Sequence, residues 1–425
     1  MFRKISRRLF FIPLLAAMLL TLTVACGNGA SDQGGEAATV HVFQFKVDTM
    51  DQMQHLANVF AEQYEDKDLT IIVETIGGTG DFAGALAARF AANDIPDLIA
   101  LNGAPLAELY MEHLVDLTNE PWVPYTVPGL LDMVTFNGRL FGQPLTIEAF
   151  GYIYNVDLFE QAGITQPPTT LSELLYVAER LDDAGIRAFS NGYAEFWVLA
   201  LHFLNGALLA DLGFDTVGRL GAEDSLANHR QLVNEMVNLL QLTTRFGGNE
   251  ASLATDYNTS VNDFAMGRAA IIQQGTWIQP TLDELNPNMR VGIFGFLTND
   301  GSNTGRIPVG NAGYWAIHNG SESVDAMRDF LTFMATDEYA INSKINDFMF
   351  IPAFVGTDYD LSTLGSIFAA LQPHIENYNT SEWLWDILPV GSGAVLSAPM
   401  QQAAIGLLSI DELIAEMDSL IAGLR

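Results

Sequence analysis

The sequence predicts an α/β protein folded as two lobes, and its length and the order of its segments are the main evidence. The chain has 425 residues, which exceeds what one compact core usually holds and suits two lobes of ordinary domain size. Its first folded segments alternate between strand-like and helix-like patterns. We find no internal repeats and no heptads, so the sequence indicates neither a repeat protein nor a coiled coil. The pattern instead indicates strands and helices in alternation.

Residues 40–101 carry this alternation most clearly. Strands are expected at 40–45, 69–76 and 97–101, with helices at 50–64 and 82–92. Such a series implies a parallel sheet with helices on both faces, and ligands of these sheets bind outside the carboxyl ends of the strands. The loops at those ends contain Lys46, Thr79, Asp81 and Asn102. These four are candidate ligand-binding residues, with ordinary turn residues as the alternative.

The remainder of the chain continues the mixed pattern. Residues 136–140 predict a hairpin, and a helix is expected at 171–181 after Pro167 and Pro168 with Thr170 as its cap. The stretch 185–246 is expected to be mainly helical. Further strands are expected at 150–155, 269–273, 291–296 and 313–318, and further helices at 323–335, 339–345 and 410–420.

The first forty residues have the features of an export signal. A basic start and an apolar run predict a signal peptide over residues 1–25, too short for a comfortable membrane span. Residues 23–26 resemble a bacterial lipobox, which implies that Cys26 is lipidated and that residues 26–39 form a flexible tether. An ordinary cleaved signal is the alternative. Export by the general secretion route and by the twin-arginine route both stay open.

The composition of the chain limits the kinds of ligand and partner that we expect it to bind. The chain has 19 Lys and Arg against 51 Asp and Glu, a formal net charge of −32, which disfavours nucleic acid and favours a neutral or cationic ligand. Cys26 is the one cysteine, so no intrachain disulfide can form. No metal site is expected, because the seven His residues are scattered without metal-ligand spacing. No cofactor is expected either.

An enzyme is the first alternative class, and the sequence disfavours it. It contains none of the nucleophile-elbow, zinc-protease or phosphate-loop motifs. A glycosidase needs only two carboxylates facing one bond. With 51 acidic residues, the number of carboxylates alone does not exclude such a pair. Since no motif indicates one, we expect a protein that is not an enzyme.

Several segments, taken in order, resemble the extracellular solute-binding proteins of family 1, which serve bacterial carbohydrate ABC importers, close in pattern to maltose-binding proteins. The most specific is Leu140 to Phe159, which resembles the family's first crossover between lobes. The others are Ile95 to Ile99, Gly163 with Pro167 and Pro168, Phe264 to Ala270, Gly275 to Trp277, and Gly406 with Ile410 to Leu413. The likeness implies a two-lobed periplasmic-binding-protein-like fold of type II, with a ligand cleft between lobes joined by a hinge.

The resemblance also implies an organisation and a set of partners. The N-terminal lobe would comprise 40–147 plus 285–325, and the C-terminal lobe 148–284 plus 326–425. The protein would be a monomer, anchored to the outer face of the cell membrane or periplasmic, that captures a mono- or oligosaccharide for the permease subunits of an ABC importer. The alternative is the same fold binding a polyamine, a metal ion or another non-sugar solute.

Five further residues are candidates for ligand contact, three through the resemblance and two through their spacing. Glu148 matches the family's sugar-binding carboxylate, with a hinge ion pair or a solvated side chain as the alternative. Trp277 matches its stacking aromatic, and Trp197 lies near its other aromatic region, with core packing as the alternative for both. Trp383 and Trp385 are two residues apart, so on a strand both would point the same way. They would then line the second lobe's side of the cleft; the alternative is that they plug a loop.

Asn311 is the last candidate. It lies between glycines in a segment expected to pass the cleft, where the backbone can approach a ligand closely. The expected mechanism is lobe closure, in which a ligand first meets one lobe and is then buried by both.

Overall fold

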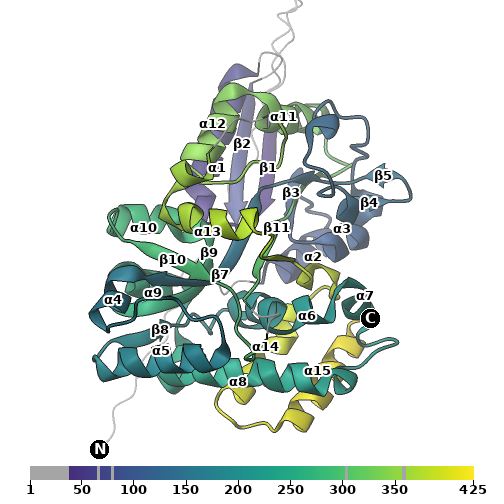
Figure 1. The fold of residues 1–425 in the computed structure, drawn as a ribbon. Helices are drawn as coiled ribbons and strands as arrows, with labels where there is room; N and C mark the ends of the chain where they lie inside the picture. The colour runs from purple at the N-terminus through teal and green to yellow at the C-terminus, as the bar shows by residue number, and fades with distance from the viewer. Residues whose placement is uncertain (1–37, 65–67, 78–80, 302–304, 357–359) are drawn as a thin grey trace, which may run out of the picture.

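A computed structural model describes residues 38–425 except 65–67, 78–80, 302–304 and 357–359. The expected signal peptide and Cys26 lie outside the described residues, as does Thr79. Two sheets, each with its own hydrophobic core, organise the chain (Figure 1). No helix of the described ranges combines the length and apolarity needed to cross a bilayer.

The first sheet has five strands in the order β2-β1-β3-β12-β6. Their bounds are β1 Ala38–Gln44, β2 Leu69–Thr75, β3 Leu98–Leu101, β6 Gln143–Pro144 and β12 Tyr314–Ile317. Strand β1 pairs in parallel with β2 and β3, which confirms the expected parallel arrangement. The sheet then continues antiparallel through β12 and β6. The carboxyl ends of the three parallel strands therefore share one edge.

Helices from two distant parts of the chain cover this sheet, and Figure 1 shows α1, α11 and α12 beside β1 and β2. The bounds are α1 Met50–Gln63, α2 Phe82–Ala92, α3 Ala104–Tyr110, α11 Val324–Thr336 and α12 Glu338–Asn346. Helix α1 buries Met53, Leu56 and Phe60 along one face, as its 3.6-residue period predicted. A small hairpin of β4 (Thr135–Phe136) and β5 (Arg139–Leu140) is attached, also as predicted.

Strand β7 (Ile147–Asn155) is the centre of the second sheet. It pairs antiparallel with β9 (Ala269–Gly275), β10 (Val291–Phe294) and β11 (Ile307–Asn311). Strand β8 (Arg187–Ser190) adds to β9 and β13 (Thr380–Glu382) adds to β11, both in parallel. With neighbours on both edges and helices on its faces, β7 is buried along most of its length.

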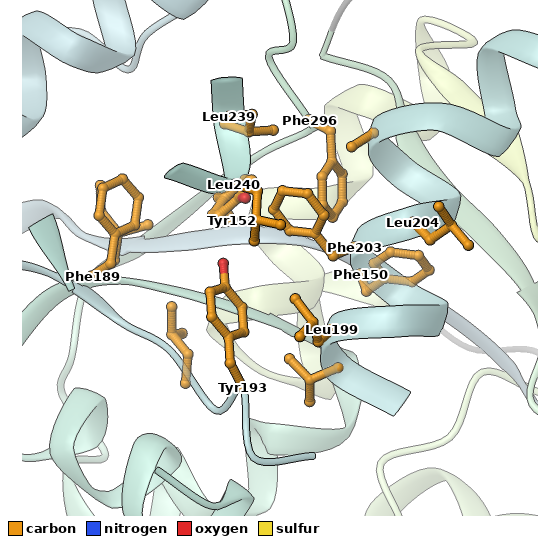
Figure 2. Close-up of a cluster of buried hydrophobic side chains, with 14 of the residues drawn as sticks. Phe150, Tyr152, Phe189, Tyr193, Leu199, Phe203, Leu204, Leu239, Leu240 and Phe296 are labelled. Atoms are coloured by element: carbon orange, nitrogen blue, oxygen red, sulfur yellow. The ribbon is translucent and has the colours of Figure 1, made fainter. Parts of the chain in front are cut away.

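The second core is the larger one. Figure 2 shows part of it, with Phe150 and Tyr152 of β7 among Phe203, Leu239 and Phe296. Its helices are α4 Val156–Gln161, α5 Leu171–Asp183, α6 Ala210–Leu212, α7 Phe214–Arg219, α8 Arg230–Phe246, α9 Tyr257–Ala265, α10 Gln279–Leu285, α13 Ser366–Glu376, α14 Ser392–Ala404 and α15 Ile410–Gly423. Thr170 caps α5 as expected, accepting a hydrogen bond from the Glu173 N–H at 3.2 Å.

The two cores divide the chain at positions other than those expected. Residues 291–311 were expected in the first lobe, but β10 and β11 pair with β7 in the second sheet. Residues 326–354 were expected in the second lobe, but α11 and α12 pack on the first core. Residues 291–311 belong to the second lobe because their strands pair with β7. Residues 326–354 belong to the first lobe because the apolar face of α11 packs on its core.

Three other segments differ from the expected pattern. Residues 197–209 are wound as a π-helix, a form with no simple sequence signature. Helices α13 and α14 contain Pro373 and Pro399, residues that disfavour a helix interior, and neither helix was predicted. Strand β13 ends at Glu382, so Trp383 and Trp385 do not lie on a strand.

We predict that Gly151→Ala destabilises the second lobe. A Cβ added at Gly151 would stand 2.7 Å from the carbonyl oxygen of Phe294 on the paired strand β10. Overpacking of this kind costs about 1–3 kcal/mol. Urea unfolding followed by circular dichroism measures it. Gly423→Ala is the control, because its added Cβ would meet no atom within 4 Å; equal unfolding midpoints for the two variants would contradict the prediction.

Candidate functional site

A cavity of about 220 Å³ lies between the lobes, and both contribute to its wall. The first-lobe side is formed by the loops after β1, β2 and β3, the edge at which ligands of parallel sheets bind. The second-lobe side is formed by the start of β7, the π-helical segment, the end of β9 and the segment that leads into α14.

Most of the candidate residues line this cavity. They are Lys46, Asp81, Asn102, Glu148, Trp197, Trp277, Trp383 and Trp385. Thr79 is outside the described residues. Asn311 does not line the cavity: it is buried, and its side-chain amide donates to the Gly313 carbonyl at 2.6 Å. Asn311 therefore holds the turn between β11 and β12.

An ion pair joins the two lobes at the cavity. The Lys46 Nζ, at the end of β1, lies 2.7 Å from Glu148 Oε1 on β7 and 3.4 Å from Asp48 Oδ2. Lys46 and Glu148 are both buried. Burial alone would lower the pKa of Lys46, but the charges of Asp48 and Glu148 outweigh it and raise that pKa. The ammonium group is therefore charged and shared by two carboxylates.

Aromatic rings form an aromatic wall on the second-lobe side of the cavity. The His202 ring stacks on Phe150 at 4.5 Å and on Trp385 at 4.7 Å, and lies 4.9 Å from Trp277. The Trp383 and Trp385 rings are 4.5 Å apart. Every one of these five rings is in contact with at least two others, so the lining rings and the fully buried Phe150 form one packed unit.

Local chemistry fixes the orientation of these rings. The indole N–H of Trp277 donates to Gln274 Oε1 at 2.8 Å, and that of Trp197 donates to Glu195 Oε2 at 3.2 Å. Glycines make room for two of the rings. A Cβ on Gly275 would stand 2.2 Å from the Trp277 ring, and one on Gly310 would stand 2.5 Å from Trp383.

His202 is a cavity-lining residue that the sequence did not reveal. The π-helix bonds residues five apart, so Trp197 and His202 lie one turn above each other and both reach the cavity. Burial, together with the charge of Lys46, lowers the pKa of His202 to about 3. The imidazole is therefore neutral, and its Nδ1 is buried without a hydrogen-bond partner among the described residues.

Asp386 is the second lining residue that the sequence did not reveal. It follows Trp385 in a short 3-10 helix, and burial raises the pKa of its carboxyl to about 7. Its Oδ1 approaches the first lobe, 2.7 Å from where a Cβ of Gly103 would stand. Gly103 has φ +112, a conformation that suits glycine. Nothing in the sequence near Asp386 distinguishes it from the many surface acids.

The residues that line the cavity are of the kinds that bind small molecules. In the part of the chain that the structure describes, no group of three or more His, Cys, Asp or Glu could hold a metal ion. The cavity instead joins an apolar aromatic wall to a small number of polar groups, the usual make-up of a small-molecule site. Two α/β lobes around such a cavity define the class of solute-binding proteins.

Comparison with known proteins gives the family. The model of the bacterial extracellular solute-binding proteins matches residues 48–341, and the chain belongs to this family. It is 20% identical over 397 residues to the melibiose/raffinose/stachyose-binding protein MelE of Bacillus subtilis, covering 89% of each chain. It is 22% identical over 341 residues to the multiple sugar-binding protein of Streptococcus mutans, covering 76% of this chain and 78% of that protein.

The fold agrees with solved structures. The structure of RafE in complex with raffinose superposes with a TM-score of 0.77 at 17% identity, over 91% of this chain and 100% of RafE. The fold is therefore the two-lobed, type II periplasmic-binding arrangement that the sequence predicted.

We predict that Asp386→Asn is more stable than the wild type at pH 8 and similar to it near pH 4. The folded protein keeps the Asp386 proton up to about pH 7, whereas the unfolded chain loses it near the ordinary value of 3.8. The wild type therefore loses stability between those two pH values, and Asn, which stays neutral, does not. We expect a difference of about 1–2 kcal/mol at pH 8, well below the full shift because the side chain is only half-buried.

Urea unfolding followed by tryptophan fluorescence at both pH values measures this difference. Glu382→Gln is the control, because Glu382 is exposed four residues earlier in the chain. A difference between Asp386→Asn and the wild type that is the same at pH 4 and pH 8 would contradict the prediction.

Proposed function

We propose that this protein is the substrate-binding lipoprotein of an ABC importer, and that it captures an oligosaccharide in the interlobe cavity and delivers it to the permease. The observation that carries the proposal is the presence of two kinds of surface in one cavity. An aromatic wall from the second lobe lines the same cavity as a charged, hydrogen-bonding wall that centres on Lys46 and Glu148.

These two walls match the two kinds of surface that a sugar presents. A pyranose ring has an apolar C–H face that packs on an indole, which suits Trp277, Trp385 and Trp197. Its hydroxyl groups donate to carboxylates in charge-assisted hydrogen bonds, which suits Glu148 and Asp48. The relatives that bind melibiose, raffinose, stachyose and multiple sugars support a sugar as the ligand.

Lobe closure is the proposed mechanism. The chain passes between the cores near residues 146–148 and 311–314, and these crossings would act as the hinge. Because Lys46 lies at the end of β1 and Glu148 at the start of β7, the ion pair would hold the polar wall in place while the lobes move around it. The permease would recognise the closed form.

The remaining parts of the proposal concern the cellular setting. Residues 1–25 would act as the export signal, and a lipidated Cys26 with the tether that follows would hold a monomeric domain at the outer face of the membrane. The protein would bind its ligand without altering it, using no cofactor.

A polyamine or another cationic solute is the second candidate ligand, and one observation favours it. Four carboxylates line the cavity, from Asp48, Asp81, Glu148 and Asp386, against the single ammonium group of Lys46. Aromatic rings also attract cations. A ligand screen separates this candidate from the sugar.

We predict that a sugar stabilises the purified domain and that Trp277→Ala removes most of this effect. A ligand at one hundred times its dissociation constant adds about 2.7 kcal/mol. Loss of the stacking ring should weaken binding by about 2 kcal/mol, or roughly thirtyfold. A thermal-shift screen of oligosaccharides, polyamines and metal ions, followed by calorimetry, measures both effects. Glu148→Gln should weaken binding similarly, because it removes the charge-assisted hydrogen bonds.

Two controls accompany the screen. Tyr378→Ala removes an aromatic ring that is 91% exposed and outside the cavity wall, and it should bind as the wild type does. The stability of ligand-free Glu148→Gln must also be measured, because Lys46 loses one of its two partners. Stabilisation by polyamines alone would replace the sugar with the second candidate.

We also predict that a saturating sugar reduces the radius of gyration. Closure brings the lobes together around the cavity, and small-angle scattering of the free and liganded domain measures the change. An unchanged radius with calorimetrically verified saturation would contradict the closure mechanism.

A further inference from the structure

Asp386 stands apart from the other carboxylates of the cavity. Glu148 and Asp48 share the ammonium group of Lys46, and Asp81 accepts a hydrogen bond from the Gly84 N–H at 2.9 Å as the cap of α2. Among the described residues, no ion pair involves Asp386, and the side-chain hydrogen bond found for it comes from Trp385. Its negative charge is therefore not compensated by the protein.

The position of Asp386 makes it a direct neighbour of any bound ligand. It lies beside Trp385, whose ring belongs to the aromatic wall, and its carboxylate reaches Gly103 of the first lobe. Asn102, which also lines the cavity, precedes Gly103. A ligand that fills the space between the aromatic wall and the first lobe would meet this carboxylate.

We propose that Asp386 is a specificity-determining residue that excludes anionic sugars from the cleft and accepts hydrogen bonds from the hydroxyl or amino groups of uncharged or amino-bearing saccharides. The inference rests on the proposed function, because it names the class of sugar that the same cavity takes. A sugar carboxylate or phosphate would bring a second negative charge to a carboxylate that lacks a counterion, in a partly desolvated site.

The charges around Asp386 support this assignment. Burial, and after it the negative charge of Asp386, raises the pKa of Tyr314 on β12, and the cavity holds Lys46, Asp48, Glu148 and Asp81. Lys46 is the one cation of the described cavity wall, and Glu148 and Asp48 already occupy it. A uronic acid would therefore find no free cation in the part of the cavity that the structure describes.

The discrimination has a predictable dependence on pH. Because burial raises the pKa of Asp386 to about 7, its carboxyl is neutral near pH 5 and charged at pH 8. A uronic acid stays ionised across this range, since ordinary carboxyl groups titrate well below it. Rejection of the acidic sugar should therefore increase as the pH rises from 5 to 8, and a purely structural role for Asp386 would produce no such dependence.

The test compares matched sugars. Raffinose and cellotriose are each titrated beside a derivative in which the terminal C6 hydroxymethyl group is oxidised to a carboxylate, by calorimetry at pH 5 and pH 8. At pH 8 we expect the neutral sugar to bind at least about tenfold more tightly than its carboxylate derivative. At pH 5 we expect this ratio of affinities to be about threefold or less. Asp386→Asn should give the smaller ratio at both pH values, and the control Glu382→Gln should keep the wild-type ratios.

Each outcome decides a separate point. Equal binding of the neutral sugar and its carboxylate at pH 8, or a ratio that Asp386→Asn leaves unchanged, would overturn the role of Asp386 while leaving sugar binding intact. A broad oligosaccharide screen that finds no sugar binder at all would instead overturn the proposed function, and this inference with it.

Discussion

The buried carboxylate of Glu148 is the constraint on which the arrangement of the site depends. Glu148 lies on β7, a strand with partners on both edges, and it is almost completely buried. A buried carboxylate is costly unless a cation compensates it, and the cation here is Lys46 from the other lobe. The two sheets must therefore meet where β1 ends and β7 begins, and the cavity forms at this meeting point.

The aromatic wall follows from the same strand. Phe150, two residues after Glu148, lies on the same face of β7 and supports the stack of His202 and Trp385. Gly275, which pairs with Phe150 from β9, leaves the space that the Trp277 ring occupies. One strand thus supplies the polar anchor and the base of the apolar wall, separated by a single residue.

The elements that the sequence predicted well are those set by local pattern. The alternation over residues 40–101 was confirmed, because the period of the apolar residues and the turn residues agree there. That alternation also brought Lys46, Asp81 and Asn102 to one cavity, since the loops after parallel strands share an edge of the sheet. Trp277 and Trp197 were predicted to line the cavity from the resemblance. Trp383 and Trp385 were predicted from their two-residue spacing on a strand, and they line the cavity although β13 ends before them.

The features that escaped prediction are those that depend on distant contacts. His202 reaches the cavity because residues 197–209 are wound as a π-helix, whereas a 3.6-residue period would turn it away from Trp197. Asp386 differs from the many other acidic residues only in its burial against Gly103, which lies 283 positions away along the chain. The observed boundary of the first lobe differs from the predicted one because β10 and β11 pair with β7. Pairing between strands so far apart in the chain cannot be inferred from the local sequence pattern.

The pKa shifts give the two walls different electrical characters. His202 lies near Lys46, and burial together with that positive charge lowers its pKa to about 3, so the aromatic wall carries no charge on its imidazole at neutral pH. The pKa of Lys46 moves in the opposite direction, because two carboxylates hold the ammonium group. The cation of the site is thereby fixed on the first-lobe side. The polar part of the cavity therefore centres on Lys46 and Glu148, and its uncharged part on the aromatic rings.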